Sequence, residues 1–508
     1  MKYVLGVDFG GSSSKATLID QSGSIIATAS REYPLYYLQD GWCEQSAEDC
    51  YEACVLNIRQ ILESSGVSRE DICALAVDSA THMAVLLDAQ DRVIRKTIHW
   101  SDRRSQAESD YLRENYLELI RSKCYNEPSP LWTLPQLMWL NTHERDSLQS
   151  AAHILFMKDY IRHRLTGDYY TDSIEAMGAM LYDETEGKWS EELCGLAGIS
   201  ADILPQVVSP ELIVGGPTAE ACRETGLAES TRIIVGSTDT VLEVLASGSI
   251  HPGQATVKLA SAGRICPIVD HGICHRMLVN YRHVVPGLWY PGTANKTCAT
   301  SYRWYRDMLC TGEKLQAERE CRDAYELLDE EAALVPPGSD GLCFHPYLLG
   351  ESTPYMDNDL RASFIGISSF HTKGHFSRAV MEGVCFSLKD SLRFLKELGV
   401  APSTASIIGG GARSPLWSQI AADVLDLPLV KAENDDSSLG AAMLAGVAAG
   451  VFASFDDAVK KCSKPERTYE PIRENAEQYE YWFQRYRAVH DALAPIYSAP
   501  KWKEWSQK

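Results

Sequence analysis

The stretch that constrains the fold most lies almost at the start of the chain, where one carboxylate stands directly before a turn of two glycines and three serines. The apolar runs at residues 3–7 and 16–20 on either side of this turn are typical of β-strands, and they predict a β-hairpin with a third strand at residues 25–29. Backbone N–H groups in such a turn form a nest for phosphate. The alternative is an ordinary tight hairpin, and this stretch alone leaves both interpretations open.

Two acidic residues stand where strands are expected to end. Asp8 closes the first strand, so its carboxylate would face any phosphate held by the turn, and the repulsion implies a hydrated divalent cation between them. Asp239 follows a strand predicted at residues 232–236 and begins a helix, a position where α/β folds place catalytic groups. A turn cap for the first and a helix cap for the second are the structural alternatives.

The order of the predicted elements indicates an α/β architecture. A helix at residues 49–64 is followed by a strand at residues 72–78, which extends the opening strands into an α/β lobe. Residues 255–269 repeat the pattern of strand, small-residue turn and strand, so we expect a second phosphate hairpin. An Ala- and Gly-rich helix at residues 437–450 requires a close neighbour, which we take to be the glycine turn at residues 409–411.

Composition restricts the partners. A chain of 508 residues, 45% of them hydrophobic, is long enough for two domains, and its net charge of -21 would repel nucleic acid and anionic lipid. No stretch approaches the roughly 18 apolar residues of a spanning helix. We therefore expect a cytoplasmic protein with no nucleic-acid or membrane partner. The fifteen cysteines are odd in number and irregular in spacing, which indicates reduced thiols.

A polar patch lies between residues 77 and 104, where two further strands are expected to end. His82 and Asp102 are expected to face one pocket there. The alternative is that His82 is a buried structural histidine and that Trp100 belongs to the core.

In their order along the chain, these stretches resemble the FGGY carbohydrate kinases, most of all the xylulokinase branch. The matching motifs are GVDFGGSSSK, DGWCEQSAEDCY, GSTDT, GGGARSPLWSQIAADVL and the C-terminal signature ASFIGISSFHTKGHFSRAVMEG. The resemblance implies an α/β fold of two ribonuclease-H-like (actin-like) domains with an interdomain cleft. It also implies an N-terminal sugar-binding and catalytic domain at residues 1–247, and a C-terminal nucleotide-binding domain with a helical tail at residues 248–508.

The same resemblance implies transfer of the γ-phosphate of ATP to a ketopentose hydroxyl, D-xylulose first, with ATP and Mg²⁺ as cofactors. Asp239 would be the general base, Asp8 would hold the magnesium-bound waters, and both would lie at the metal. The residues expected at the sugar are Thr81, His82, Trp100, Asp102 and Thr240. Those expected at the nucleotide are Gly11, Ser12, Ser13, Ser261, Gly263, Gly411 and Ala412.

Four positions depart from the family pattern. Thr240 replaces an expected asparagine, Thr81 replaces a methionine, Gln136 replaces a lysine and Ala260 replaces a glycine. The identity of the sugar substrate is therefore undecided, with ribulose, fuculose, gluconate and polyols as alternatives. A nucleotide-binding regulatory protein without transfer activity is an alternative of another class. A Rossmann oxidoreductase is disfavoured because the chain opens with strand, turn and strand. Whether the chain forms a homodimer is also open.

Overall fold

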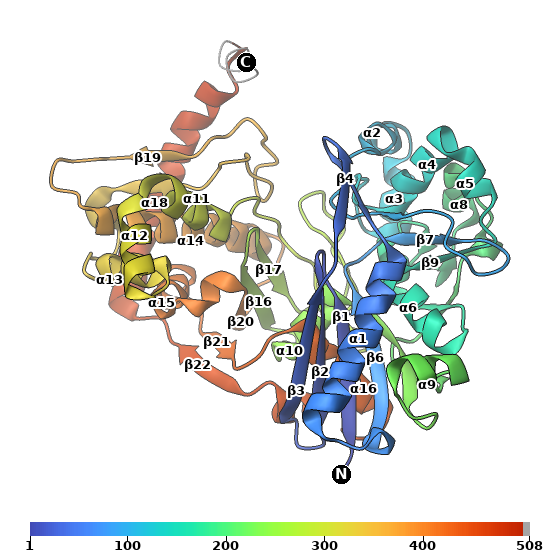
Figure 1. The fold of residues 1–508 in the computed structure, drawn as a ribbon. Helices are drawn as coiled ribbons and strands as arrows, with labels where there is room; N and C mark the ends of the chain where they lie inside the picture. The colour runs from blue at the N-terminus through green and yellow to red at the C-terminus, as the bar shows by residue number, and fades with distance from the viewer. Residues whose placement is uncertain (501–508) are drawn as a thin grey trace.

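The computed structural model describes residues 1–500, which form two lobes, each built on a mixed β-sheet (Figure 1). In the first sheet the strand order is β14-β15-β6-β1-β2-β3. Strands β1, β6 and β15 run parallel, while β1, β2 and β3 form the antiparallel meander that the opening motif predicts. The strands are β1 (Tyr3–Phe9), β2 (Ser13–Asp20), β3 (Ile25–Glu32), β6 (Ile72–Ser79), β14 (Ile213–Gly215) and β15 (Arg232–Thr238).

The second sheet has the order β17-β16-β20-β21-β22. Its β16–β17 hairpin is antiparallel and β16, β20 and β21 run parallel, so it repeats the arrangement of β2, β1 and β6. The predicted second hairpin and the α/β class with two lobes are thereby confirmed. The strands are β16 (Gln254–Leu259), β17 (Gly263–Pro267), β20 (Thr404–Ile408), β21 (Leu429–Ala432) and β22 (Pro465–Tyr469).

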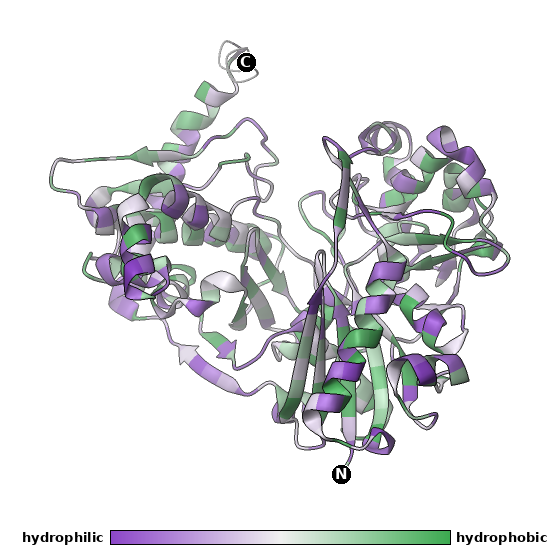
Figure 2. Ribbon diagram, in the orientation of Figure 1, coloured by the Kyte–Doolittle hydropathy of each residue, from purple (hydrophilic) through white to green (hydrophobic). Residues whose placement is uncertain are grey.

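Helices cover both faces of the first sheet. Alternate residues of β1 point to opposite sides, so Leu5 and Val7 pack towards α1 (Ala47–Ser65) and α6 (Met157–Thr166), whereas Val4 belongs to the core on the other face. Helices α10 (Asp239–Ala246) and α16 (Ser437–Ala448) cover that other face. Hydrophobic residues concentrate on the strands and on the helix faces turned towards them (Figure 2).

The Ala- and Gly-rich helix α16 lies against the first sheet although it comes late in the chain, as its orange-red ribbon beside the blue strands shows (Figure 1). A Cβ atom on Gly6 would lie 2.0 Å from the Ser438 carbonyl oxygen, and one on Gly440 would lie 2.0 Å from the Leu242 carbonyl oxygen. The small residues therefore let α16 approach β1 and α10 backbone to backbone. The predicted neighbour was wrong: the glycine turn packs against Leu259 instead.

The remaining elements form a helical layer beside the first sheet and the covering helices of the second lobe. The helices are α2 (Gln106–Asn115), α3 (Leu117–Cys124), α4 (Thr133–His143), α5 (Arg145–Gln149), α7 (Ser173–Gly178), α8 (Glu191–Ala197), α9 (Ala219–Thr225), α11 (Ala299–Leu309), α12 (Thr311–Glu320), α13 (Ala324–Ala333), α14 (Lys373–Glu397), α15 (Pro415–Leu425), α17 (Phe455–Cys462) and α18 (Arg473–Tyr497). The short strands are β4 (Leu35–Gln39), β5 (Trp42–Gln45), β7 (Ala84–Leu87), β8 (Thr97–Ile98), β9 (His153–Phe156), β10 (Tyr170–Asp172), β11 (Tyr182–Asp183), β12 (Lys188–Trp189), β13 (Gln206–Val208), β18 (Cys343–His345) and β19 (Ser363–Ile365). Within residues 1–500, no helix has the length and apolar character needed to cross a bilayer.

Candidate active site

Three carboxylates meet at one edge of the first sheet. Asp8 near the end of β1 pairs in register with Asp78 of the parallel strand β6, and Asp239 follows directly after β15. Strand β15 pairs with β6 up to the contact of Thr238 with Ser79. Because the carboxyl ends of neighbouring parallel strands lie at the same edge, the three side chains converge there. The two acids singled out in the sequence, far apart along the chain, are thus brought together.

The electrostatics of this edge reflect burial and mutual repulsion. The pKa of Asp239 is raised to about 7, mainly by burial and then by the negative charge of Asp8, while Lys258 partly offsets the shift. Burial also raises the pKa of Asp8, and it raises that of Asp78 well above the ordinary value. Among residues 1–500, one Asp8 carboxyl oxygen and both Asp78 oxygens are buried and have no hydrogen-bonding partner beyond the contact that the two carboxyls share with each other.

Such a set of unpartnered carboxylate oxygens fits a hard divalent cation. In the described part of the chain, no group of three or more acidic, histidine or cysteine side chains forms a complete metal cage. This arrangement agrees with Mg²⁺, which keeps several waters and commonly binds to one or two carboxylates together with substrate phosphates.

The first hairpin turn is held rigidly beside these acids. Its Gly10 amide donates to the Ser13 carbonyl oxygen at 3.0 Å, and the Tyr33 hydroxyl donates to the Gly10 carbonyl oxygen at 2.6 Å. A Cβ atom on Gly11 would lie 3.9 Å from the Trp100 indole nitrogen. The turn that carries Gly11, Ser12 and Ser13 therefore adjoins the predicted sugar-site residue Trp100, whose side chain is 45% exposed.

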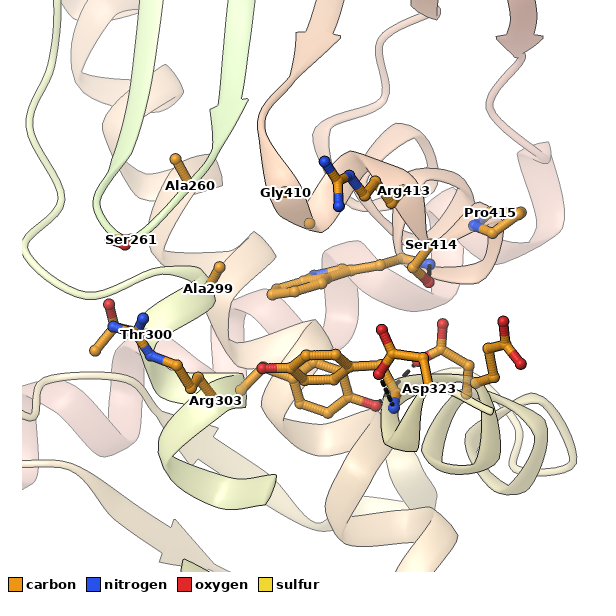
Figure 3. Close-up of a pocket in the computed structure, with 16 residues that line it drawn as sticks. Ala260, Ser261, Ala299, Thr300, Arg303, Asp323, Gly410, Arg413, Ser414 and Pro415 are labelled. Atoms are coloured by element: carbon orange, nitrogen blue, oxygen red, sulfur yellow. Dashed lines mark hydrogen bonds between the residues drawn. The ribbon is translucent and has the colours of Figure 1, made fainter. Parts of the chain in front are cut away.

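A cavity of about 680 Å³ opens beside the second hairpin. Ser261 and Gly411 line it, as do Arg303, Tyr325 and Trp417. Figure 3 shows Gly410 and Ser414 on one wall, with Arg303 and Asp323 facing them from the other. This volume suits a nucleoside, and the aromatic walls suit a flat base.

Two other residues expected at the nucleotide do not line this cavity. Ala412 is buried behind the glycine turn, and Gly263 lies in β17, where it pairs with Asn295.

A second group of side chains lies where the two lobes meet. The His82 Nε2 atom lies 2.8 Å from the Tyr281 hydroxyl, and the Thr240 hydroxyl lies 3.0 Å from the Tyr290 hydroxyl. The two tyrosine rings stack with centroids 5.6 Å apart. Thr81 also hydrogen-bonds Tyr281. Three residues expected at the sugar thus contact two tyrosines from the stretch after β17, and together they form the cluster proposed below as the acceptor pocket.

His82 is held in a strained conformation. Its φ of 74° lies in the left-handed region, its amide donates to Glu175 Oε1 at 2.7 Å, and its carbonyl oxygen accepts from the Thr133 hydroxyl at 2.7 Å. Burial lowers the pKa of His82 to about 3, so the imidazole is neutral at physiological pH. The surroundings therefore fix both the direction and the charge of this ring.

Comparison with known proteins identifies the family. Residues 3–246 match the N-terminal domain of the FGGY family of carbohydrate kinases, and residues 270–449 match its C-terminal domain. The chain belongs to the FGGY family of carbohydrate kinases. The resemblance drawn from the motifs is confirmed, and with it the phosphotransferase class and the use of ATP, which characterise FGGY kinases.

Individual FGGY relatives match over nearly the whole chain. The xylulose kinase of Bacillus subtilis (strain 168) is 30% identical, with 99% of each chain covered. The gluconokinase of the same organism is also 30% identical, covering 94% of this chain and 93% of its own. The crystal structure of xylulose kinase from Rhodospirillum rubrum matches with a TM-score of 0.89 at 28% identity, covering 98% of this chain and 100% of its own.

Asp102 lies close to this FGGY site, but its carboxylate is already engaged. It accepts from the Cys43 amide at 2.6 Å and from the Arg104 guanidinium at 2.8 Å, and the group is buried. We therefore propose that Asp102 holds the loop carrying His99 and Trp100 in place.

Sequence reasoning missed three residues that contact the predicted site residues. Asp78 had a usable signal, because it ends a predicted strand as Asp8 does. Tyr281 and Tyr290 had none, because they lie in an irregular stretch without a motif.

Proposed function

We propose that this FGGY kinase transfers the γ-phosphoryl group of ATP to a hydroxyl of an open-chain sugar, with Asp239 as the general base. The observation that supports this proposal most is the position of Asp239 between Asp8 and the cluster of His82 with the two tyrosines. It lies beside Asp8 at the sheet edge, and the adjacent Thr240 contacts the pocket of His82 and the tyrosines. A carboxylate with a pKa of about 7 is well suited to receive a hydroxyl proton near neutral pH.

The phosphates and the nucleoside have separate binding elements in this proposal. The turn with Gly11, Ser12 and Ser13 and the turn with Ser261 would hold the phosphates through backbone N–H groups. The Gly263 amide already donates to the Asn295 carbonyl oxygen at 2.9 Å, so Gly263 would shape the second turn without binding phosphate. The cavity beside Gly411 and Ala412 would take the adenosine. Asp8 and Asp239 would hold hydrated Mg²⁺, which when bound offsets the negative charge of the phosphates.

The acceptor has two candidates. D-xylulose comes first, because the xylulose kinases are full-length relatives and Thr81, His82 and Thr240 contact the same pair of stacked tyrosines. Gluconate comes second, because a gluconokinase is equally identical in sequence. We keep residues 1–247 and 248–508 as the proposed sugar-binding and nucleotide-binding divisions. A homodimer remains a prediction.

The role of Asp239 is tested by Asp239→Asn, with Asp202→Asn as a control because Asp202 is an exposed acid at the start of another helical turn. Sugar-dependent ADP release should fall about 10²- to 10⁴-fold, the range that a general base contributes, while ADP affinity measured by calorimetry stays near that of the parent. An Asp239→Asn variant with undiminished turnover would refute the assigned base. If the parent protein binds ATP but turns over no sugar, it is a nucleotide-binding regulatory protein instead.

A further inference from the structure

The further inference rests on the proposed function and concerns the chemical class of the acceptor. Lys258 of β16 and Arg264 of β17 are directly paired in register, so two cationic side chains stand next to each other on one face of the sheet. Lys258 forms an ion pair with Glu243 of α10. Within residues 1–500, Arg264 forms no ion pair and no hydrogen bond. Like charges in this arrangement repel each other, and the single carboxylate of Glu243, which acts on both Lys258 and Arg264, leaves the pair with a net positive charge.

Backbone pairing places Arg264 against the acceptor pocket. The sheet continues irregularly beyond β17: Gly263 pairs with Asn295, Val279 pairs with Gly292, and the Tyr290 amide donates to the Tyr281 carbonyl oxygen at 2.9 Å. The segments that carry the two pocket tyrosines are therefore the next two neighbours of β17.

The Arg264 guanidinium lies on the pocket side of this irregular extension. A Cβ atom on Gly292 would lie 3.7 Å from Arg264 Nε, so the side chain runs along the backbone of the segment that bears Tyr290. Its charge acts on the hydroxyls of both Tyr281 and Tyr290, the groups that contact His82 and Thr240. The guanidinium is thus a partly exposed cation at the wall of the acceptor pocket, with its hydrogen-bond donors uncommitted.

We propose that Arg264 binds a carboxylate of the acceptor, so that the substrate of this kinase is a sugar acid of the aldonate class. The charge of this site thereby ranks gluconate, which sequence similarity alone places second, above D-xylulose. A planar guanidinium matches a carboxylate with two parallel hydrogen bonds, and a partly desolvated site strengthens this pairing. The carboxylate is a handle and takes no part in the reaction. An acceptor hydroxyl oxygen forms the new bond to the γ-phosphorus, the bond from that phosphorus to the β,γ-bridging oxygen breaks, ADP leaves, and the hydroxyl proton passes to Asp239.

The test compares acids with neutral compounds of the same carbon skeleton: D-gluconate against D-glucitol, and D-xylonate against xylitol and D-xylulose. Initial rates of ADP release give kcat and KM for each acceptor. We expect one of the aldonates to have the highest kcat/KM. In Arg264→Gln its KM should rise about 10- to 100-fold, the usual effect of losing a charged hydrogen bond, whereas Arg264→Lys should recover part of the loss.

The control is Arg276→Gln, which removes the same charge from an exposed arginine of the same lobe and should leave all constants unchanged. Melting curves of each variant identify any loss of folding, and the Arg264→Lys variant still tests the role of the charge if Arg264→Gln unfolds.

Three outcomes overturn the inference. D-xylulose or a polyol as the best acceptor would show that the pocket selects a neutral sugar, and the proposed kinase function would survive. An equal fall in kcat for neutral and acidic acceptors in Arg264→Gln would show that the guanidinium serves the transferred phosphoryl group. Absence of turnover with both classes would remove the proposed function together with the inference.

Discussion

At the scale of single residues, His82 is tightly constrained within the proposed acceptor pocket. Its backbone is left-handed, its amide and carbonyl are both bonded, and its ring contacts the Tyr281 hydroxyl. Gly178 of α7 lies so close that a Cβ atom there would be 1.8 Å from the His82 ring. The glycine therefore leaves the space in which the imidazole fits.

Replacing that glycine should damage acceptor binding selectively. In Gly178→Ala the new methyl group must displace the imidazole, so we expect the acceptor KM to rise at least about 10-fold while the KM for ATP changes little. Steady-state kinetics with each substrate varied in turn measures both constants. Gly195→Ala is the matched control, because no atom lies within 4 Å of a Cβ atom at that helical glycine. An unchanged acceptor KM in a folded Gly178→Ala protein would contradict the proposed position of the acceptor.

At the scale of elements, the pair of helices α10 and α16 links the catalytic edge to the rest of the molecule. Helix α10 begins at Asp239, and α16 presses on it through Gly440 with no side chain between the two backbones. Lys15 at the first hairpin forms an ion pair with Asp436, the residue that caps α16. The position of the general base therefore depends on close contact between two helices.

A methyl group at this contact should lower the free energy of unfolding. In Gly440→Ala the Cβ atom would lie 2.0 Å from the Leu242 carbonyl oxygen, so the helices must separate, and we expect a loss of about 3 kcal/mol in the free energy of unfolding. Gly312→Ala in α12 serves as the control, because a Cβ atom there meets nothing within 4 Å and alanine favours a helix by up to about 1 kcal/mol. Unfolding in denaturant measures the free energy of unfolding of both variants. A Gly440→Ala protein as stable as the parent would show that this contact is loose.

At the scale of the whole molecule, buried imidazoles link folding to pH. Burial lowers the pKa of His82 and of His283 to about 3, and those of His99 and His345 to about 4. Each ring takes up a proton more readily in the unfolded chain, where the pKa is about 6.5. Their stabilising effect is therefore complete above about pH 6.5 and is lost as pH falls towards the folded-state value.

The effect can be measured on His283, which is 4% exposed and packs edge-to-face against Tyr290 with ring centroids 6.2 Å apart. Between pH 7.5 and pH 5 its protonation in the unfolded chain should cost the parent about 2 kcal/mol of stability that a His283→Gln variant does not lose. The difference in unfolding free energy between the two proteins should therefore shrink by that amount at pH 5. Urea melts at both pH values measure it. A difference independent of pH would mean that His283 titrates normally in the folded protein.

The topology of the whole molecule also explains which features of the fold and of the candidate site could be predicted from the sequence. The two hairpins and the acids at strand ends were predictable because each is encoded within about twenty residues, and the parallel pairing of β1, β6 and β15 then brings Asp8 and Asp239 together. Tyr281 and Tyr290 could not be predicted, because irregular segments without a sequence motif position them. The neighbour of α16 was also missed, because nothing local distinguishes a helix that packs on its own lobe from one that returns to the other.

The return of α16 to the first sheet has a consequence for how the protein is made. Part of the inner face of β1 and β6 is covered by residues 437–448, which a ribosome synthesises long after both strands. Until then the nascent N-terminal half carries an exposed apolar surface. The first lobe therefore completes its folding only after α16 has been synthesised, and a polypeptide terminated before α16 lacks part of the cover of its first strands.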